Sequence, residues 1–300
     1  MTPLRLDKIS IPIFLGLLWA QLFHALHPTW VHGQYYDYGW IVAPVTAWFF
    51  WRRWTGFDTP PILAHRQKMT LLTAVFGIII LAIFLVLART MERFDPIWRI
   101  PLILHGAVVF ATTHLTLWLV YGKRTSLTFL PLVLFAMTAV PWPTQVENSL
   151  IGELTERLLA VSAPLSRLIG IPVELSGSAL IADGRVIQID EGCSGIRSFQ
   201  SLIMAGLFVG EFVFLRNWFR VALVVIAMIS GFLTNTLRSI VLTWIFFKDG
   251  EIAFDRAHDM VGFLAFGLAA GLLLLSGHYL EGKSFQGSQR KPPGSASTSA

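Results

Sequence analysis

Long uncharged, apolar runs recur along the whole chain and alternate with short polar segments. Many of these runs reach about 15 to 20 residues, close to the length that an α-helix needs to cross the hydrocarbon core of a bilayer. The pattern therefore predicts an all-α polytopic membrane protein with about eight transmembrane helices. The predicted spans cover residues 9–27, 38–51, 70–88, 101–121, 126–142, 195–215, 219–247 and 258–280.

The longest polar segment, residues 143–194, lies between the fifth and sixth predicted spans. Its first part, 147–169, places leucine and isoleucine at helical intervals among charged residues, which predicts a small amphipathic helix on the bilayer surface. Pro164 should break or kink that helix. Its second part, 173–190, has aliphatic and β-branched residues on both sides of the turn pair Asp183-Gly184, which predicts a β-hairpin.

Composition agrees with a membrane protein. The chain is 54% hydrophobic and 14% charged, whereas soluble domains carry about 25% charged residues, which argues strongly against a soluble enzyme. Cys193 is the single cysteine, which excludes an intrachain disulfide and any site built from several thiolates. The first apolar run follows Arg5 and Lys8 without a small-residue cleavage site after it, which favours an uncleaved first span.

The distribution of charge predicts the orientation of the spans. Basic residues cluster in the loops that would lie in the cytoplasm if both termini are cytoplasmic. The segment 143–194 instead has seven acidic residues against three arginines, a net charge of −4, and is predicted to be an external insert. We therefore expect an integral membrane domain over 1–282 and a disordered cytoplasmic tail over 283–300, which is rich in Gly, Ser, Pro and Lys. The basic residues that set this orientation are Arg5, Lys8, Arg52, Arg53, Arg66, Lys68, Lys123, Arg124, Arg216, Arg220, Lys283, Arg290 and Lys291.

Three residues near the external ends of the last three spans carry the candidate chemistry. Arg238 lies inside a predicted span, where an ionisable side chain is costly and usually functional. Cys193 begins the sixth span beside glycines, and a helix start lowers the pKa of a thiol. His258 opens the eighth span and can transfer a proton near neutral pH. Individually, the three residues have simpler explanations: an assembly ion pair, a small buried thiol and an interfacial histidine.

Together, a thiol nucleophile, a proton carrier and a fixed cation are sufficient for acyl transfer. Arg197 is one helical turn after Cys193 and is expected to line the same cleft. No histidine pair has the spacing of a metal site, and no phosphate-binding or dinucleotide motif occurs. We therefore expect no metal and no cofactor, and nucleic acid is not an expected partner.

The blocks around these residues resemble the exosortase/archaeosortase family of integral-membrane cysteine transpeptidases. Residues 191–198 (EGCSGIRS) are similar to the family's Cys-Ser-Gly-Ile/Leu-Arg block, and 235–238 (NTLR) to its Asn-x-x-Arg block. His258 corresponds to the later family histidine. The resemblance implies that Cys193, Arg238 and His258 are catalytic, with support from Glu191, Ser194, Gly195, Arg197 and Asn235.

The resemblance also implies a substrate and a location. Family members act on secreted proteins whose C-terminal tail has a Pro-Glu-Pro-like motif, one transmembrane helix and a basic end. Cys193 would form a thioester with the substrate, and an unknown acceptor would then take the acyl group. Either Arg238 or His258 could be the proton donor, although charge favours Arg238 as the oxyanion stabiliser. We expect a cell inner membrane protein whose active site faces the periplasm.

Two alternatives remain at the level of sequence. The first is a permease or polysaccharide-export component in which Arg238 lines the path of the transported molecule. The second is a scaffold with a degenerate site. Coordinates should separate them, because acyl transfer requires the thiol, the guanidinium and the imidazole to meet near one point.

Overall fold

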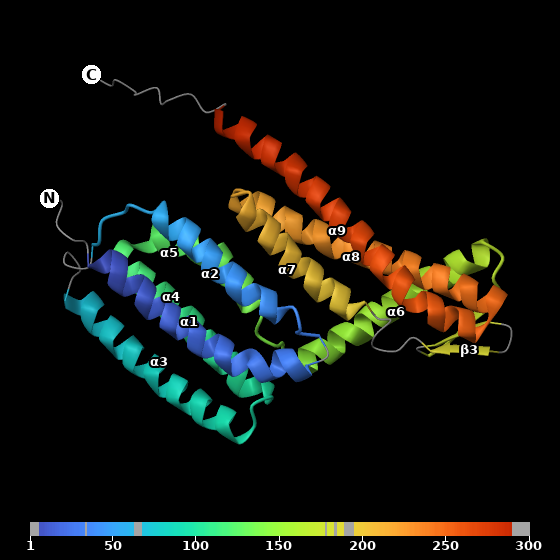
Figure 1. Cartoon of the computed structure of the whole chain (residues 1–300), viewed down its shortest axis with the longest axis horizontal. Coiled ribbons are helices and arrows are strands. Elements are labelled where there is room, and N and C mark those ends of the chain that lie inside the picture. Colours follow the sequence, from blue (N-terminus) through green and yellow to red (C-terminus); the bar gives the residue numbers. More distant parts are fainter. Residues whose placement is uncertain are drawn as a thin grey trace. The chain divides into compact units, whose positions relative to one another are not determined.

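The computed structural model describes residues 6–33, 35–62, 68–177, 179–182, 185–188 and 195–289. These residues form nine α-helices and three β-strands (Figure 1). The chain divides into two compact units, residues 1–147 and 148–300. The mostly helical architecture, with several helices long and apolar enough to cross a membrane, confirms the predicted class of polytopic helical membrane protein.

The first unit is a set of packed helices in which α4 contacts α1, α3 and α5, and α2 contacts α5 and α1. Buried residues of α1 recur every three or four positions, as expected for one face of a helix: Leu15, Leu18, Leu22 and Leu26. The helices are α1 (Asp7–His32), α2 (Gly39–Thr55), α3 (Lys68–Phe94), α4 (Arg99–Tyr121) and α5 (Lys123–Met137).

The second unit is built around three helices, of which α8 packs against both α7 and α9. Their common core contains Leu202 and Val209 from α7, Leu223 from α8 and Leu273 from α9. These helices are α7 (Ile196–Phe212), α8 (Asn217–Asp249) and α9 (Glu251–Gln289). The unit also contains most of α6 (Thr144–Leu168), which begins four residues before the boundary between the units.

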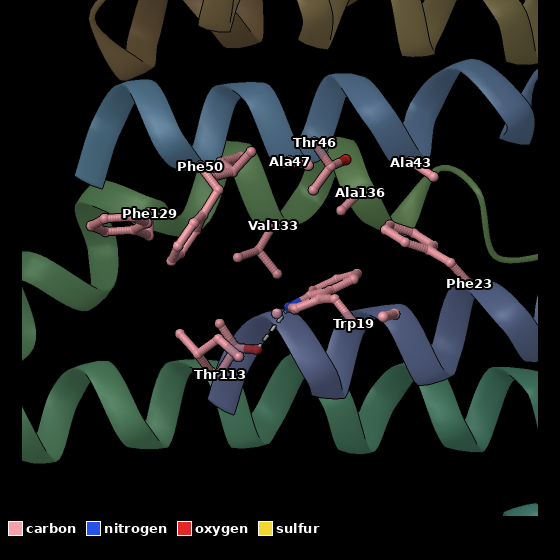
Figure 2. A pocket seen from close by; sticks show the side chains of 14 residues that line it. Trp19, Phe23, Ala43, Thr46, Ala47, Phe50, Thr113, Phe129, Val133 and Ala136 are labelled. Carbon is pink, nitrogen blue, oxygen red and sulfur yellow. Dashed lines mark hydrogen bonds between the residues drawn. The ribbon is translucent and has the colours of Figure 1, made fainter. Parts of the chain in front are cut away.

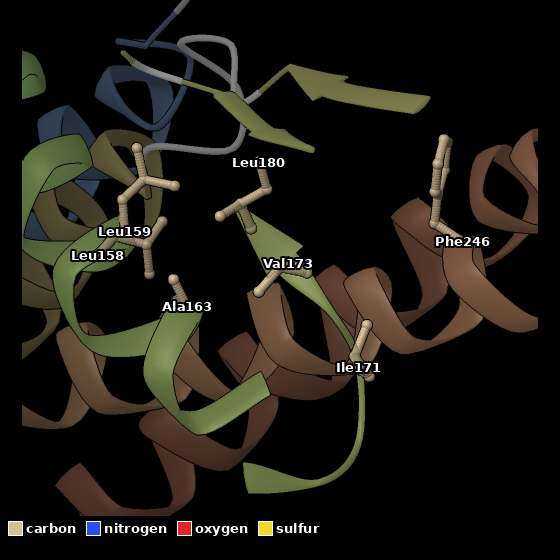
Figure 3. Close-up of a cluster of buried hydrophobic side chains, with 7 residues drawn as sticks. All are labelled: Leu158, Leu159, Ala163, Ile171, Val173, Leu180 and Phe246. Carbon is tan, nitrogen blue, oxygen red and sulfur yellow. The ribbon is translucent and has the colours of Figure 1, made fainter. Parts of the chain in front are cut away.

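A small antiparallel sheet lies between α6 and α7 in the sequence. Its strands are β1 (Val173–Ser176), β2 (Ala179–Ala182) and β3 (Arg185–Gln188), in that order, with Val173 opposite Ala182 and Ala182 opposite Arg185. Val173 and Leu180 are buried in a cluster with Leu158 of α6 and Phe246 of α8 (Figure 3). The sheet is therefore packed against α6 and the C-terminal part of α8.

The structure corrects the sequence predictions for the insert 143–194 and for the C-terminal tail. The insert has three strands, one more than the predicted hairpin. The additional strand is Val173–Ser176, which ends just before Gly177 and pairs with Ala179–Ala182. Pro164 does not end α6, which continues to Leu168. Helix α9 extends to Gln289, so the first residues of the predicted tail 283–300 are helical; positions 290–300 lie outside the described residues.

Each of the eight predicted spans coincides with a helix, but the helices differ in their capacity to cross a bilayer. Five are long and apolar enough: Asp7–His32, Thr70–Phe94, Arg99–Tyr121, Asn217–Asp249 and Glu251–Lys283. Helices α2, α5 and α7 have only 17, 15 and 17 residues, whereas a full crossing takes about 20. The number of crossings therefore stays a prediction.

Candidate active site

The predicted site residues that the structure describes all lie in the second unit. Gly195 immediately precedes α7, Arg197 lies in the first turn of α7, Asn235 and Arg238 lie on α8, and His258 lies on α9. Three predicted site residues, Glu191, Cys193 and Ser194, lie outside the described residues. Arg197 is exposed, and its role stays a prediction.

The start of α7 is held against α8 by Gly195 and Asn235. Gly195 is the N-cap of α7 and has φ +82°, in the left-handed region that favours glycine. A Cβ atom on Gly195 would come within 2.5 Å of Asn235 Nδ2, so only glycine fits. Asn235 is buried at 8% exposure. The backbone two residues after Cys193 therefore contacts the Asn-x-x-Arg block of α8.

Arg238 lies one helical turn beyond Asn235, on the same face of α8. Its Nη2 donates a hydrogen bond to Nε2 of His258 across the α8–α9 contact, at 2.9 Å. Residues 20 positions apart in the sequence thus meet through their side chains. The guanidinium has only donors, so Nε2 of His258 must be the acceptor.

This bond determines where the proton of His258 resides. Because Nε2 accepts, Nδ1 carries the hydrogen of the neutral ring. Nδ1 in turn donates to Oδ1 of Asp259, at 3.1 Å. The His258 side chain is 30% exposed and that of Asp259 is 88% exposed, so the pair is open to solvent. Phe254, one turn earlier on α9, lies against the imidazole with a ring separation of 5.9 Å.

Arg238 has a second donor with a different environment. Its Nε is buried and has no hydrogen-bond partner among the described residues. Gly262 of α9 lies next to this atom, and a Cβ there would be 3.4 Å from Nε, an ordinary van der Waals contact. Gly262 therefore places backbone, with no side chain, beside the buried Nε–H. Sequence analysis missed Gly262, although its position four residues after His258 places it on the same face of α9.

The described residues contain no group of three or more histidine, cysteine, aspartate or glutamate side chains that could hold a metal ion. The chemical groups at this site are instead a guanidinium, an imidazole and an exposed carboxylate. These groups can stabilise an oxyanion and transfer a proton.

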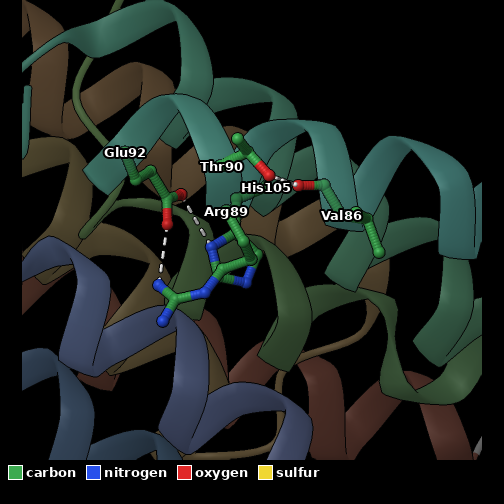
Figure 4. Close-up of polar contacts among 5 residues, drawn as sticks. All are labelled: Val86, Arg89, Thr90, Glu92 and His105. Carbon is green, nitrogen blue, oxygen red and sulfur yellow. Dashed lines mark hydrogen bonds and ion pairs between the residues drawn. The ribbon is translucent and has the colours of Figure 1, made fainter. Parts of the chain in front are cut away.

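The first unit contains a separate buried polar cluster where α3 meets α4 (Figure 4). Glu92 is 6% exposed and accepts a hydrogen bond from Arg89 Nη1 at 2.7 Å, and its other oxygen lies 2.8 Å from His105 Nδ1. His105 is fully buried. Because an unpaired buried charge is costly, Arg89 and His105 keep the Glu92 carboxylate paired where α3 meets α4. Sequence analysis assigned no role to Glu92.

A second cluster in the first unit connects the α1–α2 loop to the start of α6. Tyr36 donates to Glu147 Oε2 at 2.5 Å and accepts from the Trp142 backbone N–H at 2.9 Å. Arg99 Nη1 donates to Glu147 Oε1 at 2.6 Å. Burial, and then the hydrogen bond to Glu147, raise the pKa of Tyr36 above its ordinary value.

Substitution of Tyr36 by phenylalanine should lower the free energy of unfolding by about 2 kcal/mol at neutral pH, because a bond to a buried charged group is lost. The unfolded chain loses the tyrosine proton at pH of about 10, before the folded protein does. The native contribution is therefore present below pH 10 and declines above it. Denaturation of both proteins between pH 7 and 11 should show a difference that shrinks at high pH; a constant difference would contradict this assignment.

Residues 30–275 match the family model described as transmembrane exosortase. The matched range includes the contacts of Gly195, Asn235, Arg238 and His258. No curated protein and no solved structure matches the chain.

Proposed function

Because this chain belongs to the transmembrane exosortase family, we propose that it is a membrane cysteine transpeptidase that removes C-terminal sorting tails from secreted proteins. The observation that best supports this proposal is the hydrogen bond between Arg238 and His258. It joins a permanent cation to an acid–base group, one turn from the residue that contacts Gly195.

Cys193 is the proposed nucleophile. It is the single cysteine of the chain and lies two residues before Gly195. Two residues of extended chain span at most about 7 Å, so the thiol is tethered close to Gly195. The start of α7 also provides a positive dipole end, which favours a thiolate.

In the proposed first step, the Cys193 thiol gives its proton to Nε2 of His258, and the sulfur forms a bond with the carbonyl carbon of the scissile peptide. The carbonyl oxygen becomes an oxyanion and accepts a hydrogen bond from the Nε–H of Arg238, which has no partner among the described residues. The C–N bond then breaks, and the leaving amine takes a proton from protonated His258. The product is a thioester on Cys193, and the sorting tail leaves with a new amino terminus.

The second step reverses these roles. An acceptor nucleophile attacks the thioester carbon and gives its proton to His258, and the C–S bond breaks to release a thiolate, which takes the proton back from His258. The arrangement of the resting site adds one requirement. Nε2 of His258 already accepts a bond from Arg238, so His258 receives a proton only after exchanging that bond for one to the thiol or the acceptor.

The proposed substrate explains why the enzyme is embedded in the membrane. A tail with a Pro-Glu-Pro-like motif, one transmembrane helix and a basic end would be held in the same bilayer, which brings the scissile bond to the enzyme. We further propose that the enzyme resides in the cell inner membrane with both termini in the cytoplasm. The acidic insert 143–194 supports a periplasmic active site.

Trapping of the thioester would test the proposed function. The purified full-length protein would be incubated in liposomes with a secreted reporter that carries such a tail, and quenched in acid. Mass spectrometry should find the reporter fragment, cut near the motif, attached to Cys193. Hydroxylamine should release the fragment, because it cleaves thioesters. Removal of the tail without any adduct on Cys193 would refute the proposal, and solute transport without processing would favour a permease.

A substitution at Gly262 should test the role of the Nε–H donor of Arg238. In Gly262→Ala, the new methyl group would lie 3.4 Å from Nε, so the fold should survive while the methyl group blocks the approach of an oxyanion to this N–H. We expect kcat/KM for tail removal to fall about tenfold, equivalent to about 1.4 kcal/mol of lost transition-state stabilisation. Gly267→Ala, with open space around its Cβ, is the matched control on the same helix. Equal rates for the two variants would exclude Nε as the oxyanion donor.

A further inference from the structure

The first unit contains an apolar cavity that the proposed chemistry does not use. The cavity has a volume of about 240 Å³ and lies between α1, α2, α4 and α5. Figure 2 shows side chains from these helices converging on the space, among them Trp19, Phe50 and Val133. The cavity exists because small residues line it where larger side chains would fill it: Gly16, Ala20, Ala43, Ala47 and Ala136.

The cavity has an opening at the surface of the chain. Three of its small lining residues, Gly16, Ala20 and Ala47, are exposed. A Cβ atom built on Gly16 meets no atom within 4 Å. A molecule beside α1 and α2 can therefore enter laterally between these small residues.

The position of the cavity along α1 indicates what surrounds that opening. Helix α1 is one of the candidate membrane spans. With a rise of 1.5 Å per residue, Trp19 is about 18 Å from Asp7 and about 20 Å from His32. The cavity thus lies near the middle of the span, at the depth of the lipid tails and away from the headgroups.

The lining excludes polar occupants. None of the lining residues is charged. Trp19 Nε1 donates to Thr113 Oγ1 at 3.1 Å, and Thr113 Oγ1 donates to the Val109 carbonyl at 2.7 Å, so these groups are already satisfied. Among the polar lining groups, the buried hydroxyl of Thr46 has no hydrogen-bond partner among the described residues. A buried water needs two to four polar partners, and a headgroup needs more.

The size of the cavity distinguishes between the possible apolar occupants. A transmembrane helix has a diameter of about 10–12 Å with its side chains and cannot enter this space, so the helix of a sorting tail is excluded. An apolar cavity of about 150 Å³ can stay dry and bind benzene, and the present cavity is larger. A single hydrocarbon chain fits both the volume and the lining.

We propose that this cavity binds one acyl chain of a bilayer phospholipid, which enters laterally past Gly16 and Ala47. The chain needs no polar partner, and lipid tails are the most abundant apolar groups at this depth. The headgroup stays at the interface. Binding should therefore depend on the tail and be insensitive to the chemistry of the headgroup.

Photo-crosslinking in liposomes tests the proposal without using the processing activity, so its outcome is independent of the proposed function. The full-length protein would be reconstituted with a phospholipid that carries a diazirine at the middle of one acyl chain. After irradiation, mass spectrometry should locate the label on cavity residues of α1, α2 or α5. Phosphatidylethanolamine and phosphatidylglycerol probes should label them equally.

Two variants that fill the cavity provide the decisive comparison. Gly16→Leu and Ala47→Leu should each reduce cavity labelling about tenfold, because the excluded methylene groups lose their burial. Gly267→Leu is the matched control, since its Cβ also meets open space on a candidate span. It should leave cavity labelling unchanged. Size-exclusion chromatography would establish that each variant is folded.

Three results would overturn the proposal. Unchanged cavity labelling in both filled variants would show that the chain binds elsewhere. Uniform labelling along the outer surfaces of the helices would indicate ordinary solvation by lipid. Labelling of the cavity by an isoprenoid probe, without labelling by either phospholipid, would assign the cavity to a different hydrocarbon.

Discussion

Replacement of Cys193 by alanine should abolish removal of the sorting tail, with a loss of at least about 10³-fold, because loss of a covalent nucleophile leaves only binding and oxyanion stabilisation. The measurement is the fraction of a tail-bearing reporter processed over time in proteoliposomes. Equal amounts of variant and unmodified protein in the membrane would show that the loss is not one of insertion. Processing at an undiminished rate would refute Cys193 as the nucleophile.

The single cysteine allows this prediction to be tested without mutation. Any maleimide adduct must lie on Cys193, because the chain contains no other thiol. A membrane-impermeant maleimide added from the periplasmic side should block processing, and the same reagent confined to the cytoplasmic side should not. Failure of the cytoplasmic reagent to block processing would also support the proposed orientation. Inhibition by the cytoplasmic reagent alone would contradict it.

Replacement of Arg238 by lysine should lower kcat/KM for tail removal by about 10²- to 10³-fold, the cost typical of a lost oxyanion donor. Lysine keeps the charge but has one nitrogen on a flexible stem. It cannot bond to His258 through one nitrogen while presenting a second, fixed N–H where Nε of Arg238 lies. Single-turnover measurement of thioester formation should show that the first chemical step is the one slowed.

Arg157→Lys is the matched control for this substitution. Arg157 lies on α6, is 73% exposed and pairs with Glu153 one turn away, an exposed pair of the kind that contributes little to stability. The control should retain full activity. Near-full activity of Arg238→Lys as well would mean that the guanidinium only holds α8 and α9 together.

The sequence was sufficient to locate most helices because burial in lipid requires long apolar runs. It was less informative where tertiary contacts decide the structure. Arg220 was counted among the cytoplasmic loop charges, yet it is buried and bonds to Glu211 at 2.6 Å. Hydropathy gives no sign of such pairing. The strand Val173–Ser176 was missed as a separate element because its turn, which begins at Gly177, is less distinctive than Asp183-Gly184.

The residues of the candidate site could be predicted from motifs, whereas the contacts between them could not. Motif spacing identified Asn235, Arg238 and His258, and a lone histidine beside an aspartate indicated a proton carrier. The contact of Asn235 with Gly195 and that of Gly262 with Arg238 depend on how closely the helices approach. That distance is set by packing and cannot be read from periodicity. The tautomer of His258 follows only from the direction of its bond to Arg238.

The length of α8 has a consequence for how peptide and water reach the chemistry. Its 33 residues make a rod of about 50 Å, well beyond the roughly 30 Å of hydrocarbon that one crossing requires. Arg238 is 21 positions after Asn217, about 32 Å along the rod. For a crossing that starts at Asn217, the Arg238 guanidinium lies at the opposite boundary of the hydrocarbon core. The last turns of α8, which pack against the sheet through Phe246, then lie in the aqueous phase beyond that boundary. A scissile bond placed just beyond a membrane anchor would meet the reactive groups at that boundary without the anchor leaving the lipid.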